Sequence, residues 1–242
     1  MRNAIAMVFA GGRGVDLSVL TERRPKSAVI FAGIYRCIDF SLTNLARAGI
    51  GRVGILAQYR PASLMDHVDT GMAWDLVGAS RGVRFLPPYV KLSASEWYRG
   101  PADALYQHLD FVERADASDV LVVSGDHVYS MDYGPLLDFH HERGADLTMV
   151  FTARSLDASR FGIGELNAAG QIMNFTEKPA VPRTDLASMS VYVFRREVLV
   201  DELRRSATGG WPGGRGVIPW LQTSSTGYRM ATSATCSPWL PR

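Results

Sequence analysis

The sequence is poor in cysteine, nearly neutral in charge and free of long apolar runs. Its only two cysteines, Cys37 and Cys236, imply no disulfide framework and fit a reducing compartment such as the cytoplasm. No apolar stretch approaches the roughly 18 residues that a membrane-spanning helix needs, and Met1-Arg2-Asn3 leads into a strand-like run instead of a signal peptide. A formal net charge of +2 argues against nucleic-acid binding as the main function. We therefore expect a cytoplasmic globular protein that binds neither membranes nor nucleic acids.

Lysine is also scarce. Only Lys26, Lys91 and Lys178 are lysines among the 26 basic residues, whereas arginine and alanine are abundant. This composition suggests a GC-rich coding bias more than a functional basic surface. Because arginine is the default basic residue of the chain, the three positions that keep lysine are candidate functional residues.

The first strand-like run leads into a cluster of glycines. Residues 5–10 are mostly apolar, which predicts a buried strand, and Gly11, Gly12 and Gly14 follow at once. Glycines let backbone N–H groups approach a ligand closely and adopt positive φ at little cost. A run of such donors forms a concave anion site, whose usual occupant is phosphate. A plain strand–turn connection is the alternative, and for this segment alone it is the commoner one.

The elements that follow predict an open α/β sheet. A helix over 39–48, which Gly49 ends, precedes a strand over 52–57, so the first strands form a βαβ unit with parallel pairing. The cleanest buried strand covers 120–123. Further expected elements are helices over 63–68, from 101 onward, over 133–143 and over 197–205, strands over 28–31, 84–86, 147–151 and 191–194, and a hairpin of 162–166 with 171–176.

A second candidate site residue follows the strand over 120–123. Ligands of open α/β sheets bind beyond the carboxyl ends of the strands, and both the glycine cluster and Gly125-Asp126-His127 occupy such ends. The Asp126 carboxylate is well placed to hold Mg²⁺, which proteins bind through one or two carboxylates together with substrate phosphates. A helix N-cap explains Asp126 about equally well.

Several common motifs are absent from the sequence. The glycine cluster lacks the Gly-Lys-Ser/Thr of a Walker A loop, and Leu17 stands where the dinucleotide fingerprint ends. The five histidines are not spaced as a metal cluster, and we expect the adjacent His140 and His141 at the surface. Trp97 and Tyr98 fit either stacking on a base or packing.

Taken together, seven short motifs resemble one family. From about Ala4 to Phe194 the chain resembles the N-terminal catalytic domain of the ADP-glucose pyrophosphorylases, the glucose-1-phosphate adenylyltransferases of glycogen synthesis. Each motif alone is weak, but seven in the family's order and rough spacing form a specific match. They are residues 10–14 (AGGRG), 24–29 (RPKSAV), 35–40 (YRCIDF) with Asn44, 97–104 (WYRGPADA), 125–129 (GDHVY), 175–179 (FTEKP) and 188–194 (SMSVYVF).

The resemblance implies a fold and a reaction. The fold is a Rossmann-like three-layer α/β/α nucleotidyltransferase domain with a mostly parallel mixed sheet, over residues 1–221, with an irregular tail over 222–242. The reaction joins ATP and α-D-glucose 1-phosphate to give ADP-glucose and pyrophosphate, with Mg²⁺ as cofactor. The resemblance leaves open assembly with identical or related subunits.

The resemblance also assigns roles to residues that match the family's motifs. Asp126 binds the catalytic metal, Lys26 contacts phosphate, and Lys178 grips the phosphate of glucose 1-phosphate. The assigned residues are Lys26, Asp126 and Lys178 for catalysis; Ala10, Gly11, Gly12, Gly14, Gln107 and Gly125 for the nucleotide; and Tyr98, Gly162, Glu177, Lys178 and Ser188 for the sugar phosphate.

Three departures from the family pattern favour an alternative function. Asp16 stands where the family loop carries an arginine that supports the triphosphate, and one ion pair at about 4 Å is worth at most about 4 kcal/mol at an effective dielectric of about 20. The metal-binding aspartate that the family carries beyond the segment matching 216–221 is missing, as is its C-terminal left-handed β-helix. No acidic residue follows Glu202, which suggests a frameshift or truncation after about Leu221. The alternative is a catalytically impaired homologue that binds nucleotide or sugar phosphate as a regulatory subunit; a poorly folding fragment is a third hypothesis.

Overall fold

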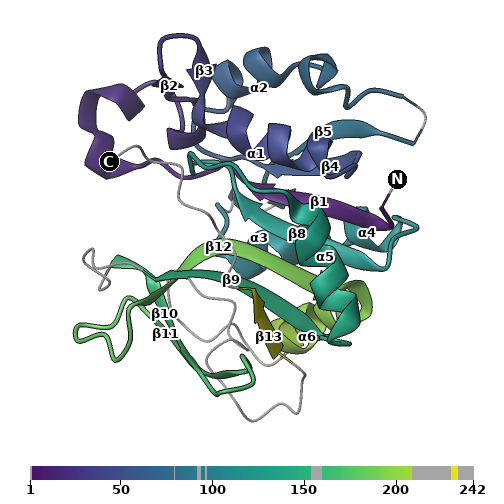
Figure 1. The fold of residues 1–242 in the computed structure, drawn as a ribbon. Helices are drawn as coiled ribbons and strands as arrows, with labels where there is room; N and C mark the ends of the chain where they lie inside the picture. Colours follow the sequence, from purple (N-terminus) through teal and green to yellow (C-terminus); the bar gives the residue numbers. More distant parts are fainter. Residues whose placement is uncertain are drawn as a thin grey trace.

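A nine-stranded sheet forms the centre of the computed structural model, which describes residues 2–78, 80–91, 94–95, 97–153, 160–208 and 230–233. The strand order is β11-β10-β12-β8-β1-β4-β5, with β9 paired to β12 and β13 paired to β9 (Figure 1). Because β8, β1, β4 and β5 run parallel, their carboxyl ends lie at one edge of the sheet. These four strands are β1 (Ala4–Phe9), β4 (Arg52–Leu56), β5 (Gly82–Leu86) and β8 (Asp119–Ser124).

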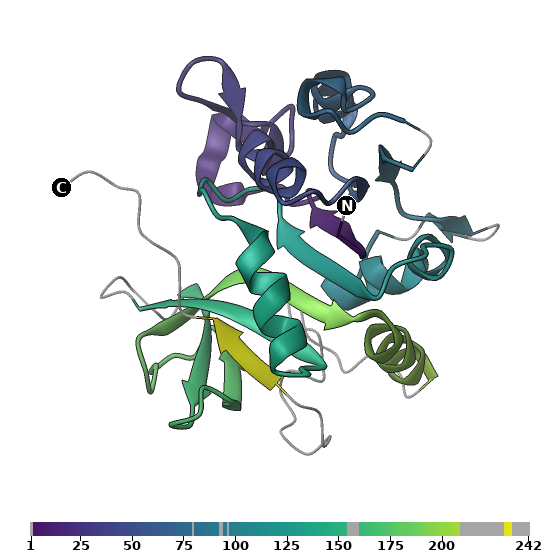
Figure 2. The same ribbon diagram turned by 45° about the vertical axis from the view of Figure 1, so that its right-hand side comes forward.

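Two apolar cores flank the sheet, one on each face. In β1, Ala6 and Val8 belong to one core, whereas Ile5 and Met7 belong to the other. Successive strand residues point to opposite faces, so a strand that is apolar at every position needs helices on both sides. The result is three layers (Figure 2). The first core includes residues of α1 (Cys37–Arg47), α2 (Ala62–Val68) and α5 (Tyr133–Glu142), and the second includes residues of α3 (Pro101–Gln107), α4 (Leu109–Glu113) and α6 (Arg196–Thr208).

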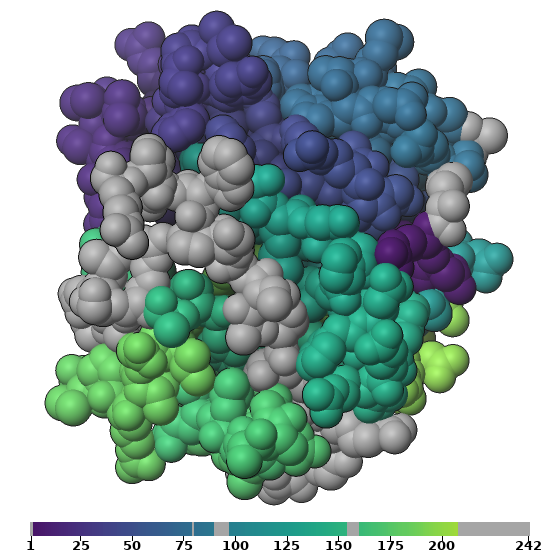
Figure 3. Space-filling model, viewed as in Figure 1, coloured from purple at the N-terminus to yellow at the C-terminus, as the bar shows by residue number. Residues whose placement is uncertain are grey.

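The other half of the sheet is organised around β12 (Leu186–Arg195). This strand runs antiparallel to β8, to β9 (Leu147–Ala153) and to β10 (Gly162–Leu166). Strand β10 forms a hairpin with β11 (Ile172–Glu177), and β13 (Met230–Ser233) runs parallel to β9. In the space-filling view, the green residues of this half lie at the opposite end from the purple and blue N-terminal segments (Figure 3).

Short elements connect these layers. Two of them follow the glycine cluster and shape the candidate site described below. They are the 3₁₀ helices η1 (Val15–Thr21), η2 (Lys26–Ala28) and η3 (Met72–Trp74), the hairpin of β2 (Ile30–Phe31) with β3 (Tyr35–Arg36), and the hairpin of β6 (Val90–Lys91) with β7 (Ala94–Ser95).

The predicted three-layer α/β/α arrangement is confirmed, with two local differences. The strand expected over 28–31 begins only at Ile30, as β2, because η2 extends to Ala28 and Ser27 Oγ donates to the Ala10 carbonyl at 3.0 Å. The helix expected from 101 onward is divided at His108, whose φ of −115° lies outside the helical range.

The expectation that His140 and His141 both lie at the surface is wrong for His140. His140 is buried, and its Nδ1 lies 2.8 Å from Thr148 Oγ1. Burial lowers the pKa of His140 to about 4, so its ring is neutral. The helical spacing could have predicted the burial of His140, because the buried Leu136 and Leu137 stand four and three positions earlier on the same face of the helix. His141 is exposed, as expected.

The predicted domain boundary at residue 221 lies outside the described residues and stays a prediction. Within the predicted tail, residues 230–233 form β13 beside β9. Each helix among the described residues is too short or too polar to span a membrane.

Replacing Leu42 in α1 tests the first core. Leu42 is fully buried in it, so Leu42→Ala leaves a cavity, and we expect a loss of about 2–5 kcal/mol in the free energy of unfolding. The matched control is Thr43→Ala on the exposed side of the same helix, which should change stability by less than about 0.5 kcal/mol. Urea denaturation followed by circular dichroism measures both. Equal losses would contradict the assignment of α1 to this core.

Candidate active site

The glycine loop after β1 is held against η2, which carries Lys26. The Lys26 N–H donates to the Gly12 carbonyl at 3.1 Å, and Ser27 Oγ donates to the Ala10 carbonyl at 3.0 Å. Gly14 has a φ of 62°, and a Cβ at this position would lie 2.9 Å from Lys26 Cβ. Only glycine combines this conformation with this contact. The loop therefore sets the position of the Lys26 side chain.

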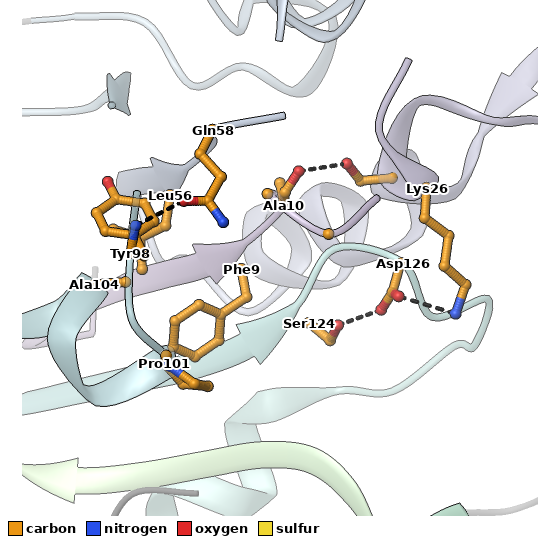
Figure 4. A pocket seen from close by; sticks show the side chains of 14 residues that line it. Phe9, Ala10, Lys26, Leu56, Gln58, Tyr98, Pro101, Ala104, Ser124 and Asp126 are labelled. Carbon is orange, nitrogen blue, oxygen red and sulfur yellow. Dashed lines mark hydrogen bonds and ion pairs between the residues drawn. The ribbon is translucent and has the colours of Figure 1, made fainter. Parts of the chain in front are cut away.

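Asp126 lies opposite Lys26, beyond the carboxyl end of β8. The Gly125 N–H donates to the Phe9 carbonyl at 2.8 Å, and a Cβ at Gly125 would lie only 3.3 Å from that oxygen. The ends of β8 and β1 therefore approach closely. Asp126 Oδ2 lies 2.9 Å from Lys26 Nζ, and Asp126 Oδ1 accepts a hydrogen bond from Ser124 Oγ (Figure 4).

The electrostatic surroundings keep Asp126 ionised. Burial raises the pKa of Asp126, but the hydrogen bond from Ser124 and the charge of Lys26 outweigh burial, and the pKa lies below its usual value. The described residues contain no cluster of three or more His, Cys, Asp or Glu able to hold a metal. A single hard oxygen ligand fits a cation such as Mg²⁺, which takes its other ligands from phosphate and water.

A cavity of about 290 Å³ lies between the glycine loop and the segment that precedes α3. Figure 4 shows Lys26 and Asp126 at one end of it and Gln58 and Tyr98 at the other. Five of the residues assigned by the resemblance besides Asp126 are among those that line it. The lining consists of Phe9, Ala10, Gly11, Gly12, Lys26, Ser27, Leu56, Gln58, Tyr98, Gly100, Pro101, Ala104, Ser124 and Asp126.

The far wall of the cavity is built by Gln58 and Tyr98. Gln58 Oε1 accepts a hydrogen bond from the Tyr98 N–H at 2.9 Å. The Tyr98 hydroxyl donates to the Leu86 carbonyl at 2.7 Å and lies 2.7 Å from His108 Nε2. Burial raises the pKa of Tyr98, so the phenol stays neutral and its hydroxyl is committed to the protein. Gln58 is a lining residue that no sequence motif indicated, although its place just beyond the carboxyl end of β4 was an available signal.

Gln107, assigned to the nucleotide, is not among the residues that line this cavity. Its Nε2 donates to Asp103 Oδ2 at 2.9 Å, and its Oε1 accepts the Tyr89 N–H at 3.0 Å. One end of the amide thus bonds within α3, and the other ties α3 to the β5–β6 connection. Gly14 and Gly125 likewise do not line the cavity. Their lack of a side chain instead allows Lys26 and the end of β1, respectively, to approach the backbone closely. The nucleotide role of all three stays a prediction.

Four of the five residues assigned to the sugar phosphate lie on or directly beside β10, β11 and β12. Gly162 is paired with Glu177, and a Cβ at Gly162 would lie 2.9 Å from Glu177 Oε2. Lys178 Nζ lies 3.8 Å from Glu177 Oε1, and the Lys178 backbone has a φ of 46°. Ser188 stands at the β12 bulge, with its Oγ 3.4 Å from the Tyr192 hydroxyl. Of the five residues assigned to the sugar phosphate, only Tyr98 lines the cavity, and it belongs to the segment that precedes α3.

His127 lies between the cavity residues around Asp126 and the residues on β10, β11 and β12. The backbone of Met189, in the β12 bulge beside Ser188, forms a hydrogen bond with the His127 ring, next to Asp126. Burial lowers the pKa of His127, which favours the neutral ring. Bulges re-aim backbone and side chains near functional sites, and this one places Met189 beside His127, just beyond the carboxyl end of β8.

Asp16 is not among the residues that line the cavity. Its side chain is 80% exposed, and Oδ2 lies 3.7 Å from the guanidinium of Arg160. Arg13 of the glycine loop lies over the Tyr59 ring at 5.8 Å. An exposed ion pair of this kind contributes little to stability, but it places the positive charge of Arg160 beside the negative charge of Asp16. The expected repulsion between Asp16 and a triphosphate is therefore smaller than the sequence alone suggests.

The sequence over residues 5–212 matches the family model for nucleotidyl transferases. The chain belongs to the nucleotidyl transferase family. It is 47% identical over 232 residues to the glucose-1-phosphate adenylyltransferase of Thermotoga neapolitana, and 43% identical over 224 residues to the enzyme of that name from Bacillus subtilis. These matches cover 94% and 91% of the chain but 55% and 59% of the relatives. The chain thus spans little more than half the length of the curated relatives it matches.

A solved structure supports the fold independently. A crystal structure from Bacillus anthracis that carries the name glucose-1-phosphate thymidylyltransferase superposes with a TM-score of 0.76 and covers 96% of this chain and 87% of its own. The two sequences are 19% identical, so the likeness concerns the fold alone. The nucleotidyl transferase fold of this chain is therefore supported by both sequence and structure.

Gly14 is predicted to be essential for placing Lys26. In Gly14→Ala the new Cβ meets the Lys26 stem at a positive φ, so we expect ATP to bind at least about tenfold more weakly. The matched variant is Gly12→Ala, whose Cβ would meet nothing within 4 Å and should cost less affinity. Titration calorimetry with ATP and thermal unfolding compare the two. Equal affinities would show that the loop does not position Lys26.

Glu177 is predicted to cost stability at neutral pH. Burial raises its pKa against the smaller opposing effect of Lys178, so the folded protein binds the proton more tightly than the unfolded chain. Ionised Glu177 therefore destabilises the fold above this pKa, and the cost disappears as pH falls below the unfolded value. Glu177→Gln should unfold at a higher temperature at pH 7, with a difference that shrinks towards pH 4. A difference that is constant with pH would refute this account.

Proposed function

We propose that this chain is the catalytic domain of a glucose-1-phosphate adenylyltransferase, acting in glycogen biosynthesis. The observation that carries the proposal is the cavity in which the glycine loop, Lys26 and Asp126 meet at the carboxyl edge of the parallel strands. The relatives of that name, at 43–47% identity over nine-tenths or more of this chain, support the choice of reaction.

The glycine loop and Lys26 would bind the triphosphate of ATP. The loop offers backbone N–H groups with almost no side-chain bulk, and the Lys26 ammonium adds a positive charge at its rim. Asp126 would hold Mg²⁺, which supplies charge neutralisation for the phosphates when it is bound. Gln58 and the Tyr98 ring close the far end of the cavity and are candidates for contact with the base.

The chemistry asked of the protein is positioning. A phosphate oxygen of glucose 1-phosphate attacks the α-phosphorus of ATP, a new P–O bond forms, and the bond to the β-phosphate oxygen breaks to release pyrophosphate. No covalent enzyme intermediate is needed, so catalysis rests on alignment and on stabilising the charge of the transferring group.

Lys178 and Glu177 would bind the sugar phosphate. Lys178 supplies an ammonium for its phosphate, and Glu177 supplies carboxylate oxygens for sugar hydroxyls. The left-handed backbone at Lys178, fixed by donation of its N–H to the Phe161 carbonyl at 3.0 Å, turns the chain just after β11. The low cysteine content supports the cytoplasm as the place of action, and the family resemblance supports assembly with related subunits.

Pyrophosphate release tests the proposal. The purified chain should release pyrophosphate from ATP with glucose 1-phosphate and Mg²⁺, and faster than from UTP or dTTP. A coupled phosphate assay with pyrophosphatase gives the rates. Measurable ATP binding without release above background would refute the enzyme and support the regulatory subunit.

Asp126→Asn should lower kcat by at least about a hundredfold, because it removes the charged oxygen ligand proposed for the metal. Asp116→Asn is the matched control, since Asp116 is exposed and lies outside the cavity lining. Steady-state kinetics at saturating Mg²⁺ measure both variants. Comparable rates for Asp126→Asn and the unaltered chain would remove Asp126 from the catalytic site.

A further inference from the structure

Both oxygens of the Asp126 carboxylate are already engaged. Oδ1 accepts the Ser124 hydroxyl, and Oδ2 lies 2.9 Å from the Lys26 ammonium. Neither partner side chain is deeply buried at this contact: the side chains of Lys26 and Asp126 are 38% and 27% exposed. The pair is therefore accessible from the cavity that both residues line.

A divalent cation and the Lys26 ammonium compete for the same oxygen. Mg²⁺ needs a carboxylate oxygen at about 2.0–2.1 Å, and the ammonium at 2.9 Å occupies the space in front of Oδ2. Two positive charges held against one carboxylate also repel each other. A cation can bind Asp126 through Oδ2 only after Lys26 has moved.

The packing of the Lys26 stem restricts where the ammonium can go. A Cβ at Gly14 would lie 2.9–3.1 Å from Cβ, Cγ and Cδ of Lys26, so the stem lies directly against the glycine loop. The Lys26 N–H is tied to the Gly12 carbonyl. Since its root and stem are held there, the ammonium, which lies on Asp126, can reach little else than the space over the glycine loop.

We propose that Lys26 is a placeholder cation that blocks Asp126 until a triphosphate draws it away. Binding of phosphate to the glycine loop would exchange the Lys26–Asp126 pair for a Lys26–phosphate pair and free Asp126 for the metal. This exchange couples metal binding to nucleotide binding through one side chain. It rests on the proposed function, because it takes the loop as the triphosphate site and Asp126 as the metal ligand.

Mn²⁺ titration of the nucleotide-free protein, followed by electron paramagnetic resonance, tests the block without catalysis. Lys26→Met should bind Mn²⁺ at least about tenfold more tightly than the unaltered chain. Lys26→Arg, which keeps a cation on a long stem, should stay weak. Arg47→Met removes a positive charge on the exposed side of α1, outside the cavity lining, and should leave the affinity unchanged. Circular dichroism establishes that each variant is folded.

The reciprocal arm measures ATP binding in EDTA by calorimetry. Asp126→Asn releases Lys26, so metal-free ATP should bind at least about tenfold more tightly than to the unaltered chain, while Asp116→Asn should match the unaltered chain. Equal Mn²⁺ affinities for Lys26→Met and the unaltered chain overturn the block. Tighter Mn²⁺ binding in Lys26→Met, together with no pyrophosphate release from the unaltered chain, would uphold the block and refute only the proposed reaction.

Discussion

The ion pair between Lys26 and Asp126 joins the two segments that make the candidate active site. Lys26 comes from η2, which the glycine loop holds in place, and Asp126 follows β8, whose end is pressed against β1. At 2.9 Å, and with both side chains partly exposed, the pair links these two segments and is weak enough to be exchanged. The proposed binding of phosphate and metal depends on this exchange.

The three-layer core fixes where this pair lies. Strand β1 sends alternate side chains into two separate cores, and its neighbours β4 and β8 pair with it in parallel. Every one of these strands therefore ends at the same edge, where Gly11, Gln58 and Asp126 follow them. Helices on both faces leave that edge as the open side of the sheet, which is why the cavity forms there.

Local patterns in the sequence predicted much of the fold and part of the site. Apolar runs located β1, β4 and β8, and the strand-end rule located the glycine loop and Asp126, because these signals are contained in a few consecutive residues. The contact partners of side chains are not contained in such local patterns. The Tyr98 hydroxyl is turned to Leu86, Gln107 accepts the Tyr89 N–H, and Asp16 faces Arg160. Each depends on a segment distant in sequence, so neither periodicity nor a motif could predict it.

The scarcity of lysine makes the central claim directly measurable. With only three lysines, a chain labelled with ¹³Cε,¹⁵Nζ-lysine gives three side-chain signals, and Lys26→Met identifies that of Lys26. We predict that the Lys26 signal shifts when Mg²⁺ and the non-reactive analogue α,β-methylene-ATP saturate the protein, and that Asp126→Asn shifts it already in the free protein. A Lys26 signal that stays in its apo position in the saturated complex would contradict the exchange on which this account depends.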